Sequence, residues 1–202
     1  EEQYCSREIL NLLKNCIRAK MNFVFCGNPG AGKTELLKFL TQYIPMHEKV
    51  MTIEDNLEIH YKQINPHSNP QWVLLSEARS VEVKYLLECF STGLHGLTTL
   101  HTDDVRKIPD RIQNMMEDAY AANRLENDIY NFINVGILLR KKVVNDRIIR
   151  SIDQVCFFDR VHEENKFIMV VQDGKLVCRD MTENILKKFE WVGIEDPFKE
   201  RR

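Results

Sequence analysis

One stretch of the chain has the residue types and the spacing of a phosphate-binding loop, Gly27-Asn28-Pro29-Gly30-Ala31-Gly32-Lys33-Thr34. It matches the pattern G-x-x-x-x-G-K-[ST] in full, between an expected strand and an expected helix. Glycine lets the backbone wrap an anion with its N–H groups inward, and the helix directs the positive end of its dipole at the phosphates. Lys33 is therefore expected to reach the β- and γ-phosphates, and the Thr34 hydroxyl is expected to bind Mg²⁺.

Two acidic groups follow buried strands that the sequence predicts over 49–53 and 72–75. The first strand runs into Glu54-Asp55 and the second into Ser76-Glu77. Ligands of open parallel sheets bind at the carboxyl ends of the strands, so Glu54 and Glu77 are expected near the phosphate-binding loop. One carboxylate would position a water and the other would hold Mg²⁺. The alternative is that these acids only cap turns, and for Glu58 a solvated role stays equally open.

A histidine, His101, follows a further polar strand expected over 96–100. At the end of such a strand, an imidazole can contact the γ-phosphate or respond to its loss. Taken alone, a structural histidine is the commoner case, so the position of His101 is what favours a functional role. The histidines at 47, 60, 67 and 162 have no metal-like spacing and are assigned no role. His95 is close enough in sequence to meet His101, but no zinc site is expected there.

Helices and strands must alternate to position these residues. Helical periodicity and capping residues predict helices over 6–20, 33–43, 80–93, 105–122 and 124–134, and apolar runs predict strands over 22–26, 49–53, 72–75, 96–100 and 135–139. This alternation predicts an α/β fold, with a mostly parallel sheet covered by helices on both faces. Strand-like alternation over 147–178, a hairpin turn at Asp173-Gly174 and a helix after Thr182 predict a small C-terminal antiparallel and helical addition at one edge.

The composition is that of an ordinary globular domain. The chain has 202 residues, 44% hydrophobic and 29% charged, which suits one sizeable core and excludes disorder and collagen-like structure. The net charge of −2 lacks the basic excess that nucleic-acid-binding domains show. No apolar run approaches the roughly 20 residues of a membrane-spanning helix. The six cysteines have no CxxC spacing, which argues against zinc ribbons and predicts free, mostly buried thiols in a reducing compartment.

The motifs occur in an order that resembles a known family. Segments 27–34, 52–55, 76–79 and 92–101 resemble the Walker A, Asp box, Walker B and His box of the type II/IV secretion ATPase superfamily, over about residues 1–160. The sequence around these motifs, including Met21-Asn22 and Ile44-Pro45, most resembles the tight-adherence (Flp) pilus and conjugation-type branch of this superfamily. The lack of a tetracysteine zinc motif favours the same branch.

This resemblance implies a RecA-like P-loop NTPase fold and ATP hydrolysis coupled to protein export or pilus assembly. It implies a RecA-like ATPase core over 1–145 and a C-terminal strand hairpin and helix over 146–202, packed on that core. Glu54 corresponds to the water-activating base, and Glu77 to the Walker B acid that holds Mg²⁺ through water. His101 corresponds to the residue that senses nucleotide state, and Arg79 follows the Walker B acid without an assigned role.

The resemblance also implies cofactors, partners and a location. ATP and Mg²⁺ are the expected cofactors, and the full-length protein is expected to form a homo-hexamer. Its expected location is cytoplasmic, peripheral at the cytoplasmic face of the membrane, in contact with inner-membrane components of a secretion or pilus machine. No specific nucleic acid is expected as a partner.

The chain departs from the family pattern at three places. Ser76 replaces the glycine that usually precedes the Walker B acid, which is a mild change. Residues 61–71 are much shorter than the arginine-bearing stretch expected between the Asp box and Walker B. The family's N-terminal domain, whose interface arginines complete a neighbour's site, is missing, and the start at Glu1-Glu2 is interpreted as that of a piece of a longer protein. Such a piece is expected to bind ATP but to hydrolyse it slowly.

Two other functions stay open. One is a RecA-like motor that moves along nucleic acid, for which the basic cluster is Arg140-Lys141-Lys142 with Arg147 and Arg150. A solvated hairpin is the simpler interpretation of that cluster. The other is a nucleotide-binding scaffold without turnover, against which the intact Glu54 and Glu77 argue. A DNA-stimulated ATPase assay tests the first alternative, and a phosphate-release assay tests the second.

Overall fold

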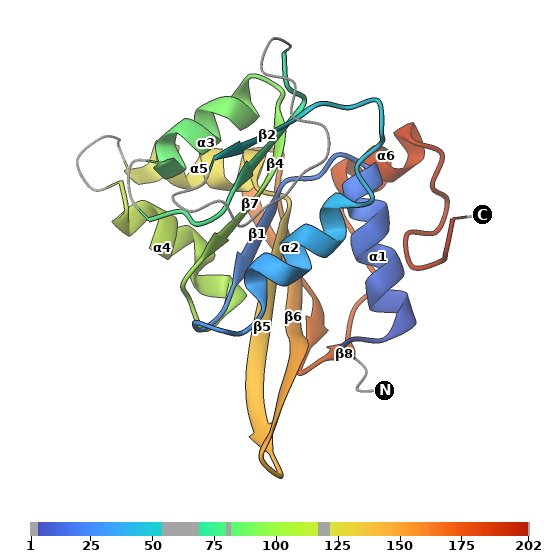
Figure 1. Ribbon diagram of the computed structural model, residues 1–202. Helices are drawn as coiled ribbons and strands as arrows, with labels where there is room; N and C mark the ends of the chain where they lie inside the picture. Colours follow the sequence, from blue (N-terminus) through green and yellow to red (C-terminus); the bar gives the residue numbers. More distant parts are fainter. Residues whose placement is uncertain (1–3, 54–68, 80–81, 117–121, 202) are drawn as a thin grey trace.

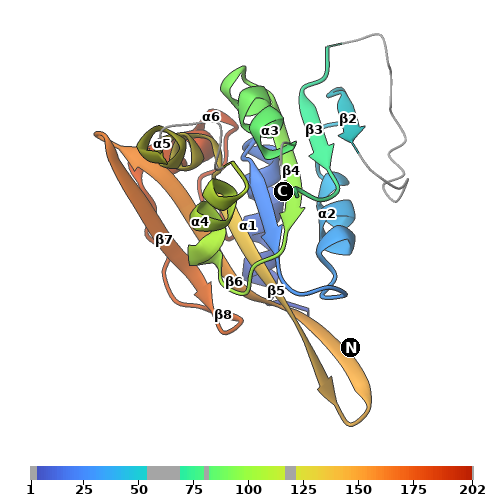
Figure 2. The same cartoon turned by 90° about the vertical axis from the view of Figure 1, so that its left-hand side faces the viewer.

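A single sheet runs through the molecule, with helices packed on both of its faces (Figures 1 and 2). The structure is a computed structural model that describes residues 4–53, 69–79, 82–116 and 122–201. Within these residues the sheet has the strand order β2-β3-β4-β1-β5-β6-β7-β8. The strands from β2 to β5 are parallel, and β6 to β8 are added antiparallel at the β5 side. The predicted α/β class, with its antiparallel C-terminal addition, is confirmed.

The apolar runs at 23–26, 72–75 and 96–100 form short buried strands, as predicted. The predicted burial of the strand over 49–53 was wrong, because only Val50 of Val50–Ile53 is buried. The strands are β1 Phe23–Cys26, β2 Val50–Ile53, β3 Trp72–Leu75, β4 His95–Leu100, β5 Val135–Val144, β6 Arg147–Val161, β7 Glu164–Gln172 and β8 Lys175–Leu176. Strand β1 lies at the centre of the parallel part, where Cys26 is in register with Leu100 of β4 and Leu138 of β5. The segments that follow β1, β3 and β4 therefore leave the sheet at the same edge.

The helices are α1 Arg7–Arg18, α2 Lys33–Thr41, α3 Glu82–Ser91, α4 Ile108–Asn114, α5 Ala122–Phe132 and α6 Glu183–Trp191. The prediction of one helix over 105–122 was wrong, because a 3₁₀ turn, Val105–Lys107, precedes α4, and α4 ends at Asn114. The Asp104 side chain accepts the Arg106 N–H and caps the 3₁₀ turn. Pro109 has no N–H and stands in the first turn of α4, where none is needed.

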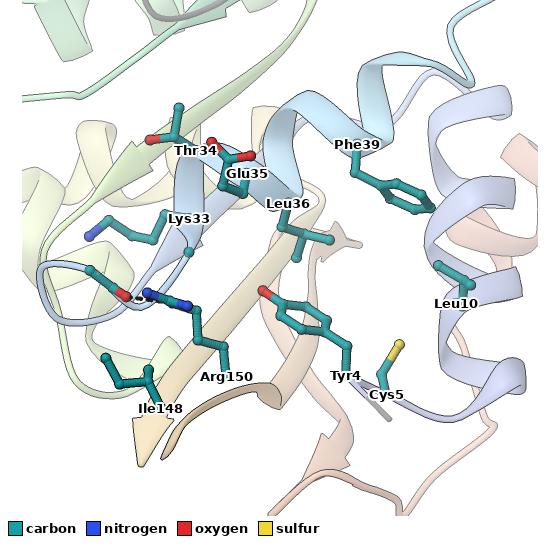
Figure 3. A pocket seen from close by; sticks show the side chains of 12 residues that line it. Tyr4, Cys5, Leu10, Lys33, Thr34, Glu35, Leu36, Phe39, Ile148 and Arg150 are labelled. Carbon is teal, nitrogen blue, oxygen red and sulfur yellow. Dashed lines mark hydrogen bonds between the residues drawn. The ribbon is translucent and has the colours of Figure 1, made fainter. Parts of the chain in front are cut away.

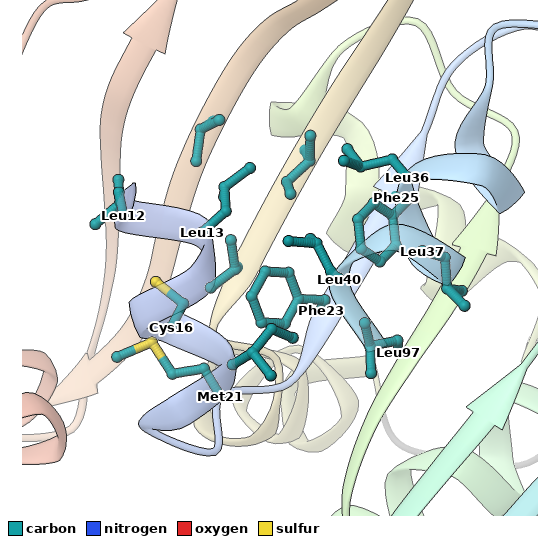
Figure 4. Close-up of a cluster of buried hydrophobic side chains, with 14 of the residues drawn as sticks. Leu12, Leu13, Cys16, Met21, Phe23, Phe25, Leu36, Leu37, Leu40 and Leu97 are labelled. Atoms are coloured by element: carbon teal, nitrogen blue, oxygen red, sulfur yellow. The ribbon is translucent and has the colours of Figure 1, made fainter. Parts of the chain in front are cut away.

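Two hydrophobic clusters lie on opposite faces of the sheet, and β1 contributes to both. Its side chains alternate, so Phe23 and Phe25 join the cluster formed with α1, α2 and α6 (Figure 4). Val24 and Cys26 join the second cluster, formed with α3, α4 and α5. The strand that leads into the phosphate-binding loop is thus packed from both sides.

Strands β5 and β6 form a ribbon that projects beyond the rest of the sheet (Figure 2). The predicted end of β5 at residue 139 was wrong: the strand continues to Val144 because β6 pairs with it along its whole length. Asn145 and Asp146 have φ of 48° and 59°, as the tight turn of a two-residue hairpin requires. The expected boundary between the ATPase core and the C-terminal segment, at residues 145 and 146, falls at this tip. The division of the chain into these two parts stays a prediction.

The described residues contain no disulfide and no membrane-spanning helix. All six cysteines are free, and Cys16, Cys26 and Cys156 are buried while the other three are half-buried. Burial raises the pKa of Cys5 to about 11, so its thiol is protonated at neutral pH. None of the helices described combines the length and apolar character that crossing a membrane requires.

Candidate functional site

The segment Gly27–Thr34 connects β1 to α2 in the conformation of a phosphate-binding loop (Figure 3). Gly27, Gly30 and Gly32 have φ of 138°, 75° and 96°, values that favour glycine. A Cβ on Gly27 would lie 2.4 Å from the Leu139 carbonyl oxygen, so no larger residue fits there without a shift of the backbone. Asn28, Pro29 and Ala31 fill the loop between the glycines, and Lys33 opens α2. The predicted strand–loop–helix context is confirmed.

The Lys33 side chain lies under this loop and is largely buried. Its ammonium group donates a hydrogen bond of 2.9 Å to the Gly27 carbonyl oxygen and lies 3.4 Å from Nδ1 of His101. Burial lowers the pKa of Lys33, while the negative charge of Glu77 opposes that shift. The Lys33 ammonium group therefore lies at the base of the glycine-rich loop, where a positive charge can meet phosphate oxygens.

Glu77 and His101 come together because β3 and β4 are neighbouring parallel strands. The Ala78 N–H donates to the Thr99 carbonyl, and the Thr99 hydroxyl donates to the Ser76 carbonyl, which fixes the segment after β3 against β4. As a result, Oε1 of Glu77 lies 2.9 Å from Nε2 of His101. The sequence predicted that both residues lie near the loop, but their direct contact was not foreseen.

Arg79 lies beside the same carboxylate. Its guanidinium donates a hydrogen bond of 2.9 Å to Oε2 of Glu77. This bond is the main reason why the pKa of Glu77 is lowered, with smaller contributions from the charges of His101 and Lys33. Glu77 is thus ionised at neutral pH, and Arg79, whose role the sequence left open, keeps it so.

Glu54, the expected base of the Asp box, lies outside the described part of the chain, as do Asp55 and Glu58. Strand β2 ends at Ile53, in register with Leu75, and its last carbonyl accepts the Ser76 N–H at 3.1 Å. Strand β2 therefore ends at the level of the sheet where Ser76 leaves β3. The water-activating role of Glu54 stays a prediction.

A cavity of about 930 Å³ opens beside the loop, between α1, α2 and the β5–β6 ribbon (Figure 3). Gly30, Gly32, Lys33 and Thr34 line its polar end. Its other walls carry mainly apolar groups, which come from Tyr4, Leu10, Leu36, Phe39 and Ile148. Tyr4 reaches the cavity because its carbonyl accepts the Ile152 N–H at 3.1 Å. The position of Tyr4 in the cavity wall was not predicted, because no local sequence pattern places a residue before α1 beside one in β6.

Known proteins are similar to this chain in sequence and in fold. A family model described as Type II/IV secretion system protein matches residues 3–68. A VirB11 protein of Agrobacterium fabrum is 31% identical over 111 residues, which cover 54% of this chain and 28% of that protein. These matches make the chain similar in sequence to proteins of the type II/IV secretion ATPase superfamily.

A further relative is similar in sequence, and two solved structures are similar in fold. An uncharacterized Bacillus anthracis protein is 28% identical over 168 residues, covering 71% of this chain and 38% of that protein. The VirB11 ATPase of the Brucella suis type IV secretion system superposes with a TM-score of 0.66 at 21% identity, over 74% of this chain and 52% of that one. The pilus retraction motor PilT, solved with bound ADP, gives 0.59 at 16% identity, over 87% and 53%.

The chain spans less than half the length of the curated superfamily relatives named above. The comparisons include proteins of several secretion and pilus systems and do not separate the branches of the superfamily. The tight-adherence branch therefore stays a prediction.

Proposed function

We propose that this chain is the ATPase domain of a motor that hydrolyses ATP to drive secretion, pilus assembly or conjugation. The observation that carries the proposal is the chain of contacts from Lys33 through His101 to Glu77, directly behind the phosphate-binding loop. A loop alone suffices to bind phosphate. A carboxylate and an imidazole beside it are the additional groups that turnover of the γ-phosphate needs.

Each side chain has a distinct role in this proposal. Lys33 and the loop N–H groups bind the β- and γ-phosphates, and His101 responds to whether the γ-phosphate is present. The Thr34 hydroxyl and the ionised Glu77 carboxylate suit Mg²⁺, which uses one or two oxygen ligands from the protein together with phosphates and waters. Mg²⁺ neutralises charge on the phosphates. Glu54 activates the attacking water.

The cavity beside the loop supplies a place for the nucleoside. Its polar end is the loop and its mainly apolar walls suit a purine ring, which buries a flat apolar surface. Burial raises the pKa of Tyr4 to about 12, so its hydroxyl stays neutral and can donate or accept a hydrogen bond. ATP is therefore the proposed ligand, with its base in this cavity.

The assembly and location of the whole protein are part of the same proposal. A homo-hexamer at the cytoplasmic face of the membrane would bring arginines of one subunit to the site of the next, and inner-membrane components of the machine would be its partners. A nucleic-acid-translocating motor is less well supported, because the basic cluster is partly engaged within the chain. Arg140 pairs with Asp153, and Arg150 donates to the Gly30 carbonyl.

A phosphate-release assay tests the proposal. The chain is expected to release phosphate from ATP, and slowly where arginines of a neighbouring subunit are not in place, because loss of an arginine finger costs about 10³-fold or more in rate. Chelation of Mg²⁺ should stop the release, and single-stranded DNA should leave the rate unchanged. Strong stimulation by DNA would favour the nucleic-acid motor. The absence of Mg²⁺-dependent release, with ATP still bound, would favour a scaffold without turnover.

Replacing His101 with alanine should impair turnover and spare binding. The imidazole contacts Lys33 and Glu77 but contributes nothing to the loop N–H groups, so ATP affinity should change less than about threefold. Turnover should fall about 10²-fold or more, the usual cost of removing one group that contacts charge developing in the transition state. Calorimetric titration and phosphate release measure the two quantities separately. The exposed His47, changed to alanine, serves as a control, and equal rates for both variants would show that His101 is only structural.

A further inference from the structure

One face of the β5–β6 ribbon is directed at the phosphate-binding loop. Lys141 is paired in register with Arg150, and Val143 with Ile148. Residues directly opposite each other on antiparallel strands point to the same face, and the next pair but one shares that face. Of these four residues, Arg150 and Ile148 line the cavity beside the loop (Figure 3).

The two cations of this face lie at the loop itself. Nε of Arg150 donates a hydrogen bond of 2.9 Å to the Gly30 carbonyl oxygen. Its Cδ lies 3.2 Å from the point where a Cβ on Gly32 would stand, and Nζ of Lys141 lies 3.6 Å from the corresponding point on Gly30. Both positive side chains therefore lie next to the backbone that wraps the phosphates.

Among the described residues, these two charges lack the carboxylate partner that Arg140 and Arg106 have. Arg140, one residue before Lys141, pairs with Asp153, and Arg106 pairs with Asp104. In the described part of the chain, neither Lys141 nor Arg150 has an ion pair with a carboxylate. Like charges directly opposite each other destabilise a strand pair. An anion bound between the ribbon and the loop would turn this repulsion into attraction.

We propose that Lys141 and Arg150 bind the phosphate groups of the nucleotide from the ribbon side, so that loop and ribbon enclose the ligand together. This inference rests on the proposed function and names two further phosphate-binding residues within the same chain. The Arg150 guanidinium has donors beyond Nε, and its planar fork matches phosphate oxygens, while Lys141 adds a point charge. A nucleotide is favoured over a nucleic-acid backbone because both cations adjoin the loop rather than an open surface.

The test uses charge-removing variants and a control from the other face of the same ribbon. Lys141→Gln and Arg150→Gln should each weaken ADP and ATP binding about tenfold, the effect of one charge-assisted hydrogen bond. The loss should be smaller for AMP, which carries one phosphate. Lys142→Gln should bind all three nucleotides as the unchanged chain does, because Lys142 pairs with Ile149 on the opposite face. Isothermal titration measures all of these affinities.

A second measurement separates phosphate binding from a merely structural role. Without nucleotide, Lys141→Gln should raise the thermal midpoint of unfolding or leave it unchanged, because it removes a like-charge pair. With saturating ADP its midpoint should fall below that of the unchanged chain. If Arg150 only holds the Gly30 carbonyl, Arg150→Gln should lower the midpoint equally with and without ADP, which would overturn its assignment.

The outcomes distinguish this inference from the function on which it rests. If both ribbon variants bind ADP as Lys142→Gln does while Lys33→Ala abolishes binding, the ribbon proposal fails and the nucleotide site stands. If Lys33→Ala also binds normally, both proposals fail. If the ribbon variants lose affinity for single-stranded DNA but not for ADP, the cations belong to a nucleic-acid surface and the inference is wrong.

Discussion

Changing Lys33 to alanine is expected to weaken ATP binding by about 100-fold or more, the effect of two lost charge-assisted contacts with phosphate. The Lys33 side chain starts from the first residue of α2, and its ammonium group lies beneath the loop, 2.9 Å from the Gly27 carbonyl oxygen. The two other cations at the loop, Arg150 and Lys141, lie at Gly30 rather than at the Gly27 carbonyl, so neither takes the position of the Lys33 ammonium group. Isothermal titration with ATP measures the loss.

The matched control for this change lies on the same helix. Lys38 forms an ion pair with Glu35 at 3.2 Å near the protein surface, so Lys38→Ala removes an equal charge from α2 without touching the loop. It should bind ATP with the affinity of the unchanged chain. Circular dichroism should show both variants folded, and an unchanged affinity for folded Lys33→Ala would refute the assignment of the loop.

Changing Glu77 to glutamine is expected to reduce turnover about 10²-fold or more while ATP affinity changes little. The carboxylate is held ionised by Arg79 and contacts His101, and an amide preserves its shape without its charge. Because the proposed role is to hold Mg²⁺, the Mg²⁺ concentration needed for half-maximal turnover should rise in this variant. Phosphate release across a magnesium titration gives both values.

Glu54→Gln provides the comparison that separates the two carboxylates. As the proposed base, Glu54 should also be required for turnover, but its loss should leave the magnesium requirement unchanged. If Glu54→Gln hydrolyses ATP at the normal rate, the base lies elsewhere and Glu77 becomes the better candidate. If Glu77→Gln retains both the normal rate and the normal magnesium requirement, its assignment as the metal-holding acid is wrong.

The parts of the site that the sequence predicted depend on local chemistry. The loop from Gly27 to Thr34 carries its own conformation in its glycines, and the strand at 72–75 has the bounds that its apolar run predicts. Glu77 and His101 were identified because each directly follows a strand, and parallel strands bring their carboxyl ends to one edge. Their mutual contact needed the register of β3 on β4, which no single segment encodes.

The parts that were missed depend on contacts between distant segments. Residues 140–144 carry three charges in succession and lack the pattern of a half-buried strand, yet they extend β5 because β6 pairs with them. Tyr4 and Ile148 both line the cavity, although most of the chain separates them in the sequence. The helix predicted over 105–122 was too long at both ends: Pro109 marked an irregularity, but helical periodicity did not predict the 3₁₀ turn at Val105–Lys107 or the end of α4 at Asn114.

Strand β1 has a mechanical consequence for the loop that it carries. It is hydrogen-bonded on both edges, and its side chains belong to the hydrophobic clusters of both faces. Local opening at β1 would expose both clusters at once, so its free energy approaches that of global unfolding. The base of the loop is therefore expected to stay in place when a ligand binds. A structural change on ligand binding is expected instead in the two elements beside the loop, α2 and the β5–β6 ribbon.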